Sequence, residues 1–284
     1  MGVRESSYAA SLGTEAHVTI RGAHVRYFQA GEGPSVVLFH GLGDAAITWH
    51  DNVGPLAQRF ATVVPDLPGH GHSHPAPWRR FTVERCAEWV LAFLGALGLE
   101  EACLVGNSIG GYLAASAALK HPTRIRRLVL ENSAGLGKEI ATFLRLMSLP
   151  LLGEFLARPT MGNLRSVMRI CLHDPSVVSE EFLQALHREM SRPGNKAAML
   201  RMLRSGVTLL GMKGSNILLD RLREMEVPTL VIWGRQDAVL PVAHAHRAVA
   251  RLPNATLHVF EQCGHLPHME HRDEFNRLLL EFLT

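Results

Sequence analysis

The sequence predicts an α/β protein with a mostly parallel central sheet and helices on both faces. Short continuous apolar runs are typical of strands buried on both sides, and amphipathic segments of helical period separate them. The chain has 284 residues, of which 47% are hydrophobic and 19% charged, so one large domain can bury a substantial core. Strands that alternate with helices indicate crossover connections and a parallel sheet.

The first elements differ from the rest, because residues 17–30 alternate between apolar and polar side chains. They predict two short strands at an antiparallel edge, followed by a turn at residues 31–34. Continuous apolar runs then predict the buried strands, at residues 36–39, 61–64, 102–105, 128–130, 229–233 and 256–260. Amphipathic segments between and after them predict helices, at residues 47–60, 83–97, 109–121 and 273–283.

The alternation stops between residues 135 and 225, where several helix-like stretches occur without a convincing strand. We therefore expect a core of residues 1–134 and 226–284, with residues 135–225 inserted as a helical cap, or lid. Eight of the ten methionines lie in this insertion. They indicate a soft apolar surface, either packed in the core or forming a deformable wall over a substrate.

Composition excludes several classes of protein. The net charge is +3, and no basic patch with interleaved aromatic residues indicates a nucleic-acid partner. No apolar run reaches the length needed to cross a membrane, and no secretion signal is recognisable. The four cysteines lack metal or redox spacing, which favours free thiols and a cytoplasmic location. The sequence leaves open whether the chain forms a homo-oligomer.

The strongest motif is the pentapeptide of residues 106–110, Gly-Asn-Ser-Ile-Gly. It directly follows a predicted strand and directly precedes a predicted helix. A nucleophilic serine needs such a sharp turn, and glycines two residues before and after it avoid clashes. This context predicts that Ser108 is a catalytic nucleophile.

A serine hydroxyl needs a base, and the base needs an acid to orient it. His265 follows the last predicted strand, and Asp237 follows the strand before it, so both belong at the carboxyl edge of the sheet. The chain order Ser108, Asp237, His265 suits a hydrolase triad. Glu131, at the end of the strand before the insertion, is the competing acid.

The oxyanion formed on attack needs two donors. We expect them to be the backbone N–H groups of Ile109, next to the nucleophile, and of Leu42, in the loop after the 36–39 strand. His40 is expected to support that loop without reacting. Asn107 and Leu266, which flank Ser108 and His265, are the candidate substrate contacts.

Together, His40-Gly41, residues 66–71 (Asp-Leu-Pro-Gly-His-Gly), the Ser108 turn, Asp237 and Gly264-His265 resemble the α/β-hydrolase superfamily from about residue 17 to the C-terminus. Within it, residues 106–111 and 257–283 are similar to the meta-cleavage-product hydrolases, which cut a carbon–carbon bond. This resemblance implies the α/β-hydrolase fold with an inserted cap.

The chain departs from that subfamily in having Leu266 where a tryptophan is usual, and in lacking a Gly-Pro-Gly loop and a recognisable cap arginine. The expected function is therefore hydrolysis of carboxylic esters with small or medium acyl groups through an acyl-enzyme. The alternative is carbon–carbon hydrolysis of ring-fission products, in which His265 first helps to ketonise the substrate.

Other functions have weaker support. Residues 41–46 together with Asp66 fit a dinucleotide-binding fingerprint, but that function leaves Ser108, Asp237 and His265 without a role. The histidine sets at 70, 72, 74 and at 265, 268, 271 lack a complete metal-ligand pattern. A non-catalytic binding module on a hydrolase scaffold is a third alternative. We expect no cofactor and no metal.

Overall fold

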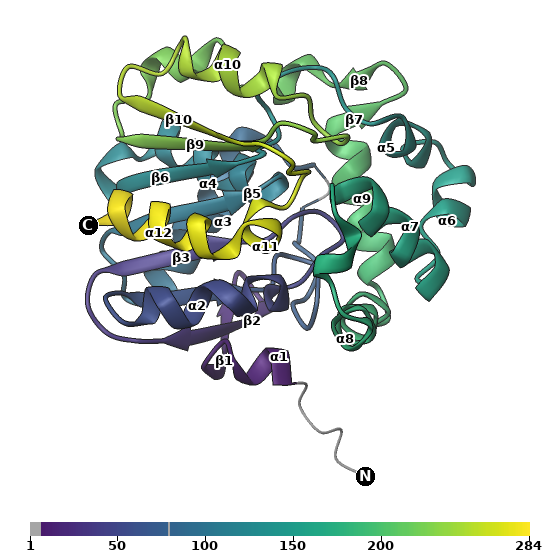
Figure 1. Cartoon of the computed structure of the whole chain (residues 1–284), viewed down its shortest axis with the longest axis horizontal. Helices are drawn as coiled ribbons and strands as arrows, with labels where there is room; N and C mark the ends of the chain where they lie inside the picture. Colours follow the sequence, from purple (N-terminus) through teal and green to yellow (C-terminus); the bar gives the residue numbers. More distant parts are fainter. Residues whose placement is uncertain (1–6, 79) are drawn as a thin grey trace.

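A computed structural model describes residues 7–78 and 80–284. Its main feature is a sheet with the strand order β1-β2-β4-β3-β5-β6-β9-β10 (Figure 1). The strands are Thr14–Ile20 (β1), Ala23–Ala30 (β2), Ser35–Phe39 (β3), Ala61–Pro65 (β4), Ala102–Asn107 (β5), Ile125–Glu131 (β6), Thr229–Gly234 (β9) and Ala255–Phe260 (β10).

Strand direction follows the predicted pattern. Strand β2 runs antiparallel to both neighbours, β1 and β4, and all pairs from β4 to β10 are parallel. The parallel strands share one carboxyl edge, where the loops after β3, β5, β6, β9 and β10 meet. The mostly parallel sheet and its antiparallel edge are confirmed.

Helices pack on both faces of the sheet because successive side chains of each strand point to opposite sides. On β3, for example, Val37 and Phe39 belong to one buried cluster, whereas Val36 and Leu38 belong to the other. The first cluster lies under α3 (Val83–Ala96), α4 (Ile109–Lys120) and α10 (Ala243–Val249). The second lies under α2 (His50–Ala57), α11 (Pro267–Glu270) and α12 (Arg272–Leu283).

The helical insertion (residues 135–225) lies beyond the carboxyl edge of the sheet and connects β6 to β9 (Figure 1). Its helices are Thr142–Met147 (α5), Leu152–Leu156 (α6), Met161–Cys171 (α7), Glu180–Met190 (α8) and Asn195–Gly206 (α9). It also contains a small hairpin of Val207–Thr208 (β7) and Gly211–Met212 (β8). The expectation of a strand-free insertion is wrong here, since two-residue strands are too short to leave a periodic pattern.

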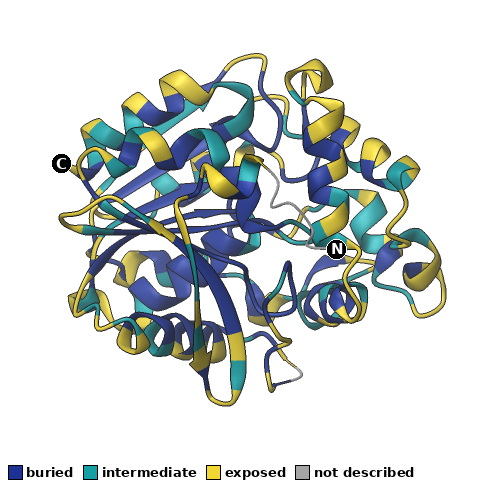
Figure 2. Ribbon diagram, turned by 90° about the horizontal axis from the view of Figure 1, so that it is seen from below, coloured by how far each residue is buried: buried dark blue, intermediate teal, exposed yellow. Residues whose placement is uncertain are grey.

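The remaining elements are single turns. They are the helix Ser7–Ala10 (α1) and the 3-10 turns Ala46–Trp49, Pro122–Arg124, Pro175–Val177, Gly214–Asn216 and Arg221–Glu224. Figure 2 shows the central strands buried along most of their length, with exposed residues on the outer faces of the helices. No helix in the described part of the chain combines the length and hydropathy that crossing a membrane requires.

A buried arginine joins the insertion to the sheet. Arg26, on β2, donates from Nε to Asp66 Oδ2 at 2.7 Å and from Nη2 to Glu189 Oε2 at 2.7 Å. Asp66 follows β4 and Glu189 belongs to α8 of the insertion, so one guanidinium group holds both parts. The same Asp66 carboxylate accepts the N–H groups of Ala46 and His72. Asp66 therefore organises the neighbouring loops.

Candidate active site

Ser108 lies on the turn between β5 and α4 with φ 54° and ψ −115°, a strained backbone conformation for a residue with a side chain. Its own N–H donates to Glu131 O at 3.0 Å, and its carbonyl accepts the N–H of Ala134 at 2.9 Å. Both partners come from the end of β6 and the segment just after it. The strain is thus held by the neighbouring strand, as the predicted serine turn requires.

The two glycines of the motif are explained by close approaches. A Cβ on Gly106 would lie 2.4 Å from the backbone of Gly110, and a Cβ on Gly110 would lie 2.3 Å from Phe39 O. Only hydrogen atoms fit at these points, which lets the start of α4 pack directly against β5 and β3.

His265 and Asp237 are joined as the sequence predicts. His265 Nδ1 lies 2.8 Å from Asp237 Oδ2, and both side chains are almost completely buried. Asp237 Oδ1 accepts two backbone N–H groups, from Val239 at 2.7 Å and Leu240 at 3.0 Å. The carboxylate is thereby fixed in place and holds the ring through Nδ1, and His265 and Ser108 line the same cavity.

Electrostatics around His265 favour the protonated ring. Burial lowers the pKa of His265, but the charge of Asp237 and its hydrogen bond outweigh burial, so this pKa lies above its usual value. Glu131 and Asp44 act in the same direction more weakly. An imidazole that gains a proton readily is suited to general-base catalysis.

Sequence reasoning missed Asn132, which supports the acid. Its Nδ2 donates to Asp237 Oδ2 at 2.6 Å, and its backbone adopts φ 41°, in the left-handed region that asparagine tolerates best after glycine. The available signal was its position directly after β6, at the carboxyl edge of the sheet. That position alone does not reveal a contact with a residue 105 positions later.

Glu131, the competing acid, bonds a different histidine. Its Oε1 lies 2.8 Å from His268 Nδ1 and accepts the His268 N–H at 2.9 Å. The Trp49 ring stacks on His268 with centroids 4.2 Å apart. This second buried pair fixes the start of α11, directly after the His265 loop. The sequence pattern indicated His268 only as a candidate metal ligand.

The loop after β3 is held by His40, as expected. Burial lowers the pKa of His40 to about 4, so the ring is neutral at pH 7. Its Nε2 accepts the Leu67 N–H at 2.9 Å, and its Nδ1 lies 2.8 Å from Gly41 O. The loop places Leu42 beside Ser108 on the cavity wall. Ile109 begins α4, where the first N–H groups have no partner within the helix.

Two cavities meet at Ser108. The larger is lined by core residues, including Ser108 and His265, and by all five helices of the insertion. The smaller shares Leu42 and Ser108 with it and is walled by apolar side chains. These include Phe81, Ile109, Ile140, Met202 and Leu240.

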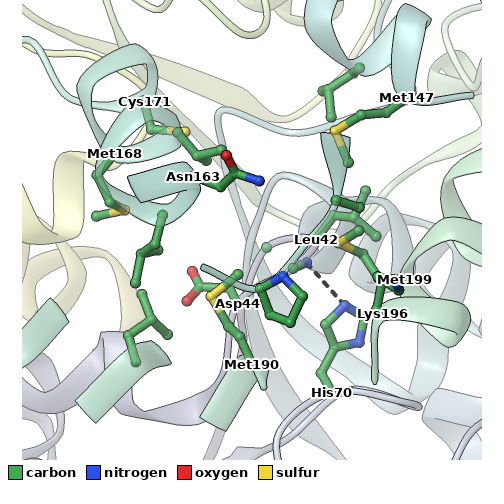
Figure 3. Close-up of a pocket in the computed structure, with 18 of the residues that line it drawn as sticks. Leu42, Asp44, His70, Met147, Asn163, Met168, Cys171, Met190, Lys196 and Met199 are labelled. Carbon is green, nitrogen blue, oxygen red and sulfur yellow. Dashed lines mark hydrogen bonds between the residues drawn. The ribbon is translucent and has the colours of Figure 1, made fainter. Parts of the chain in front are cut away.

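Both predicted substrate contacts line the larger cavity. Leu266 is buried there beside His265. Asn107 also reaches the cavity, and its Nδ2 donates to His265 O at 3.0 Å, so it positions the histidine backbone as well. Four methionines of the insertion form part of the wall: Met147, Met168, Met190 and Met199 (Figure 3).

The charged side chains on the wall of the larger cavity are Asp44, Arg158 and Lys196. Lys196, at the start of α9, is half-buried on its wall, and the described residues supply no carboxylate within salt-bridge distance of it. His70 accepts the Gly43 N–H at 3.0 Å, and burial lowers the pKa of His70 to about 3. In the described ranges, no group of three His, Cys, Asp or Glu side chains is arranged to hold a metal ion.

A family model described as alpha/beta hydrolase fold matches residues 34–272. The chain belongs to the alpha/beta hydrolase family. The resemblance to that superfamily and the fold class are therefore confirmed.

Among relatives of this hydrolase is a 2-hydroxy-6-oxononadienedioate/2-hydroxy-6-oxononatrienedioate hydrolase from Comamonas testosteroni, 34% identical, with 90% of this chain and 89% of the relative covered. A 2-hydroxy-6-oxo-6-phenylhexa-2,4-dienoate hydrolase from Burkholderia cepacia is also 34% identical over the same shares. A solved meta-cleavage product hydrolase from Pseudomonas fluorescens, CumD, superposes with a TM-score of 0.82 at 26% identity, covering 96% and 98% of the two chains.

These relatives contradict the expectation of carboxylic-ester hydrolysis, which is wrong. They support the alternative, carbon–carbon hydrolysis of ring-fission products. The physical reason for the error is that both reactions use the same serine, histidine and aspartate. Single departures such as Leu266 do not outweigh a sequence similarity that spans about 90% of the chain.

Proposed function

We propose that this hydrolase cleaves the C5–C6 bond of 2-hydroxy-6-oxo-dienoates, the products of aromatic ring fission. The observation that carries the proposal is the 34% identity, over 90% of the chain, to hydrolases named for such substrates. The joined His265 and Asp237, together with Ser108 on its strained turn, supply the groups that the reaction needs.

The proposed reaction begins with ketonisation, in which His265 helps to move a proton from the 2-hydroxyl group to C5. Ser108 then attacks the C6 carbonyl as His265 takes its proton, and the N–H groups of Leu42 and Ile109 stabilise the oxyanion. The C5–C6 bond breaks with its electrons passing into the conjugated fragment, which takes the proton from His265 and leaves as 2-hydroxypenta-2,4-dienoate. Water finally hydrolyses the acyl-enzyme to a carboxylic acid and restores Ser108.

The two cavities fit the two halves of such a substrate, which lie on either side of the bond that breaks. The apolar cavity suits the acyl half, because its walls offer hydrocarbon and aromatic contacts. The larger cavity suits the dienoate half, because its carboxylate needs a cation and Lys196 lies on that wall with no acidic partner among residues 7–78 and 80–284. The insertion would act as a lid over both halves.

The direct test uses 2-hydroxy-6-oxo-6-phenylhexa-2,4-dienoate, whose conjugated chromophore disappears on cleavage. The wild-type protein should consume it and release benzoate and 2-hydroxypenta-2,4-dienoate in equal amounts, measured by chromatography. Ser108→Ala should lower kcat by several orders of magnitude, because no other group replaces the nucleophile.

The matched control is Ser116→Ala. Ser116 is a buried serine of the same helix α4, and its hydroxyl only donates to Tyr112 O within that helix. This variant should retain most of the activity. Absence of the two products with the wild-type protein, or equal turnover in Ser108→Ala, would overturn the proposal.

A further inference from the structure

Asp44 is a carboxylate inside the candidate active site to which neither the triad nor the oxyanion loop gives a role. It directly follows Leu42 and Gly43 and lines the larger cavity with Ser108 and His265. Figure 3 shows its side chain directed into the space between the core and the insertion. The wall of this cavity is mainly apolar and includes Met190.

Asp44 is half-buried, and its charge has fewer partners than those of Asp66 and Asp237, whose side chains are fully buried. Within residues 7–78 and 80–284, its one hydrogen bond is from the Ala45 N–H to Oδ1, at 2.9 Å, and no cation lies within salt-bridge distance. Asp66, in contrast, bonds Arg26 and two backbone N–H groups, and Asp237 bonds His265 and two backbone N–H groups. An anion without such partners is costly in an apolar cavity.

The groups that face Asp44 come from four different parts of the structure. His268 and His265 favour its ionised form, whereas Asp66 opposes it, and all three influences are weaker than burial. Cys171, at the end of α7, also interacts with it and keeps its proton, because burial raises the thiol pKa. Burial raises the pKa of Asp44 to about 7, so its carboxyl group changes charge near neutral pH.

We propose that Asp44 is a specificity-determining residue that couples the binding of carboxylate ligands to uptake of a proton on its own side chain. A carboxylate entering this cavity next to ionised Asp44 would place two negative charges in an apolar space. Protonation of Asp44 removes one of them and lets its O–H donate to the ligand, so anions bind to the protonated form.

This inference deepens the proposed function and rests on it only for the identity of the substrate. The proposed substrates are carboxylates, and hydrolysis of the acyl-enzyme creates a new carboxylate beside Ser108. With Asp44 protonated, the anionic substrate enters at a low electrostatic cost. When Asp44 releases its proton, repulsion favours departure of the acid product.

The test is a calorimetric titration with benzoate, and with benzamide as the uncharged probe of the same shape. It is carried out on His265→Gln, so that the imidazole does not titrate, with and without Asp44→Asn. In His265→Gln alone, benzoate should bind at least about tenfold more weakly at about pH 8.5 than at about pH 6, because Asp44 loses its proton between them. With Asp44→Asn added, benzoate affinity should change less than about twofold over this range.

Benzamide should bind with the same affinity at both pH values in both proteins. The control substitution is Asp51→Asn, which removes a partly exposed carboxylate from α2, outside the cavity, and should leave the pH dependence of benzoate unchanged. The proposal is overturned if benzoate affinity still depends on pH in the protein that carries both His265→Gln and Asp44→Asn. It is also overturned if benzoate affinity does not depend on pH in His265→Gln alone. Because binding of benzoate requires no turnover, these outcomes are independent of whether the dienoate is cleaved.

Discussion

At the scale of single residues, the chemistry depends on how strongly Asp237 acts on His265. The pKa of His265 is raised by this carboxylate in spite of burial. A base whose pKa is raised remains protonated, and hence inactive, up to a higher pH. We therefore expect kcat/KM for the dienoate to fall on the acid side with a midpoint above about pH 6.5.

Asp237→Asn should move this midpoint to lower pH and reduce kcat by about 10³- to 10⁴-fold, since the amide no longer stabilises the imidazolium. The measurement is the pH profile of kcat/KM for both proteins. An acid limb at the same pH in Asp237→Asn would show that another group sets it.

Lys196 gives a second residue-scale prediction, because it is the proposed partner of the substrate carboxylate. Lys196→Met should raise KM for the dienoate by about tenfold or more while changing kcat much less, which corresponds to about 1.4 kcal/mol or more of lost binding. Lys138→Met removes the same charge from an exposed position of the insertion and should have little effect. Equal KM values in the two variants would exclude Lys196 as the partner.

At the scale of elements, the sequence predicted the order and type of the core strands and the helices α2, α3, α4 and α12, with ends that differ by a few residues, but it did not predict α10 or α11. It could do so because buried strands and amphipathic helices leave periodic patterns. The β7–β8 hairpin was missed because it is too short to leave one. Asn132 and His268 were missed as supporting residues because their contacts join positions more than 100 residues apart, which a local pattern does not encode.

The packing of α4 against the sheet can be tested with two glycines of opposite environment. Gly110→Ala should destabilise the fold by about 1–3 kcal/mol, because its Cβ would collide with Phe39 O. Gly95→Ala, on the exposed side of α3 with open space around the new Cβ, should stabilise it by about 0.5–1 kcal/mol. Denaturant unfolding of both variants provides the comparison. Changes of the same sign in the free energy of unfolding of the two variants would refute the role assigned to Gly110.

At the scale of the whole molecule, one buried guanidinium group links the core to the insertion. Arg26→Met would leave the buried Asp66 and the partly buried Glu189 without their cation, so we expect a loss of about 3–5 kcal/mol in the free energy of unfolding. Arg21→Met breaks an exposed ion pair between Arg21, in the turn that joins β1 and β2, and Glu88, and should cost at most about 1 kcal/mol. Similar losses in both variants would contradict the importance of burial.

The proposed substrate could not be obtained from the sequence motifs alone, since ester and carbon–carbon hydrolysis require the same triad. The cytoplasmic location also stays a prediction. What distinguishes the two reactions is the shape and charge of the cavities, and these are built from side chains of the insertion and the core that approach each other only in the folded chain.

The contact between α7 and the His265 loop limits how the insertion can be exchanged between related enzymes. Cys171 O accepts the His265 N–H at 2.5 Å, and Glu270 accepts the N–H groups of Gly264 and His173, each at 2.7 Å. Gly264 has no room for a Cβ against Cys171 O. A chimera with the insertion of another enzyme would therefore pack the backbone of His265 against residues that do not come from this chain. Recombination should preserve activity only when residues 171–174 and 263–270 are inherited together.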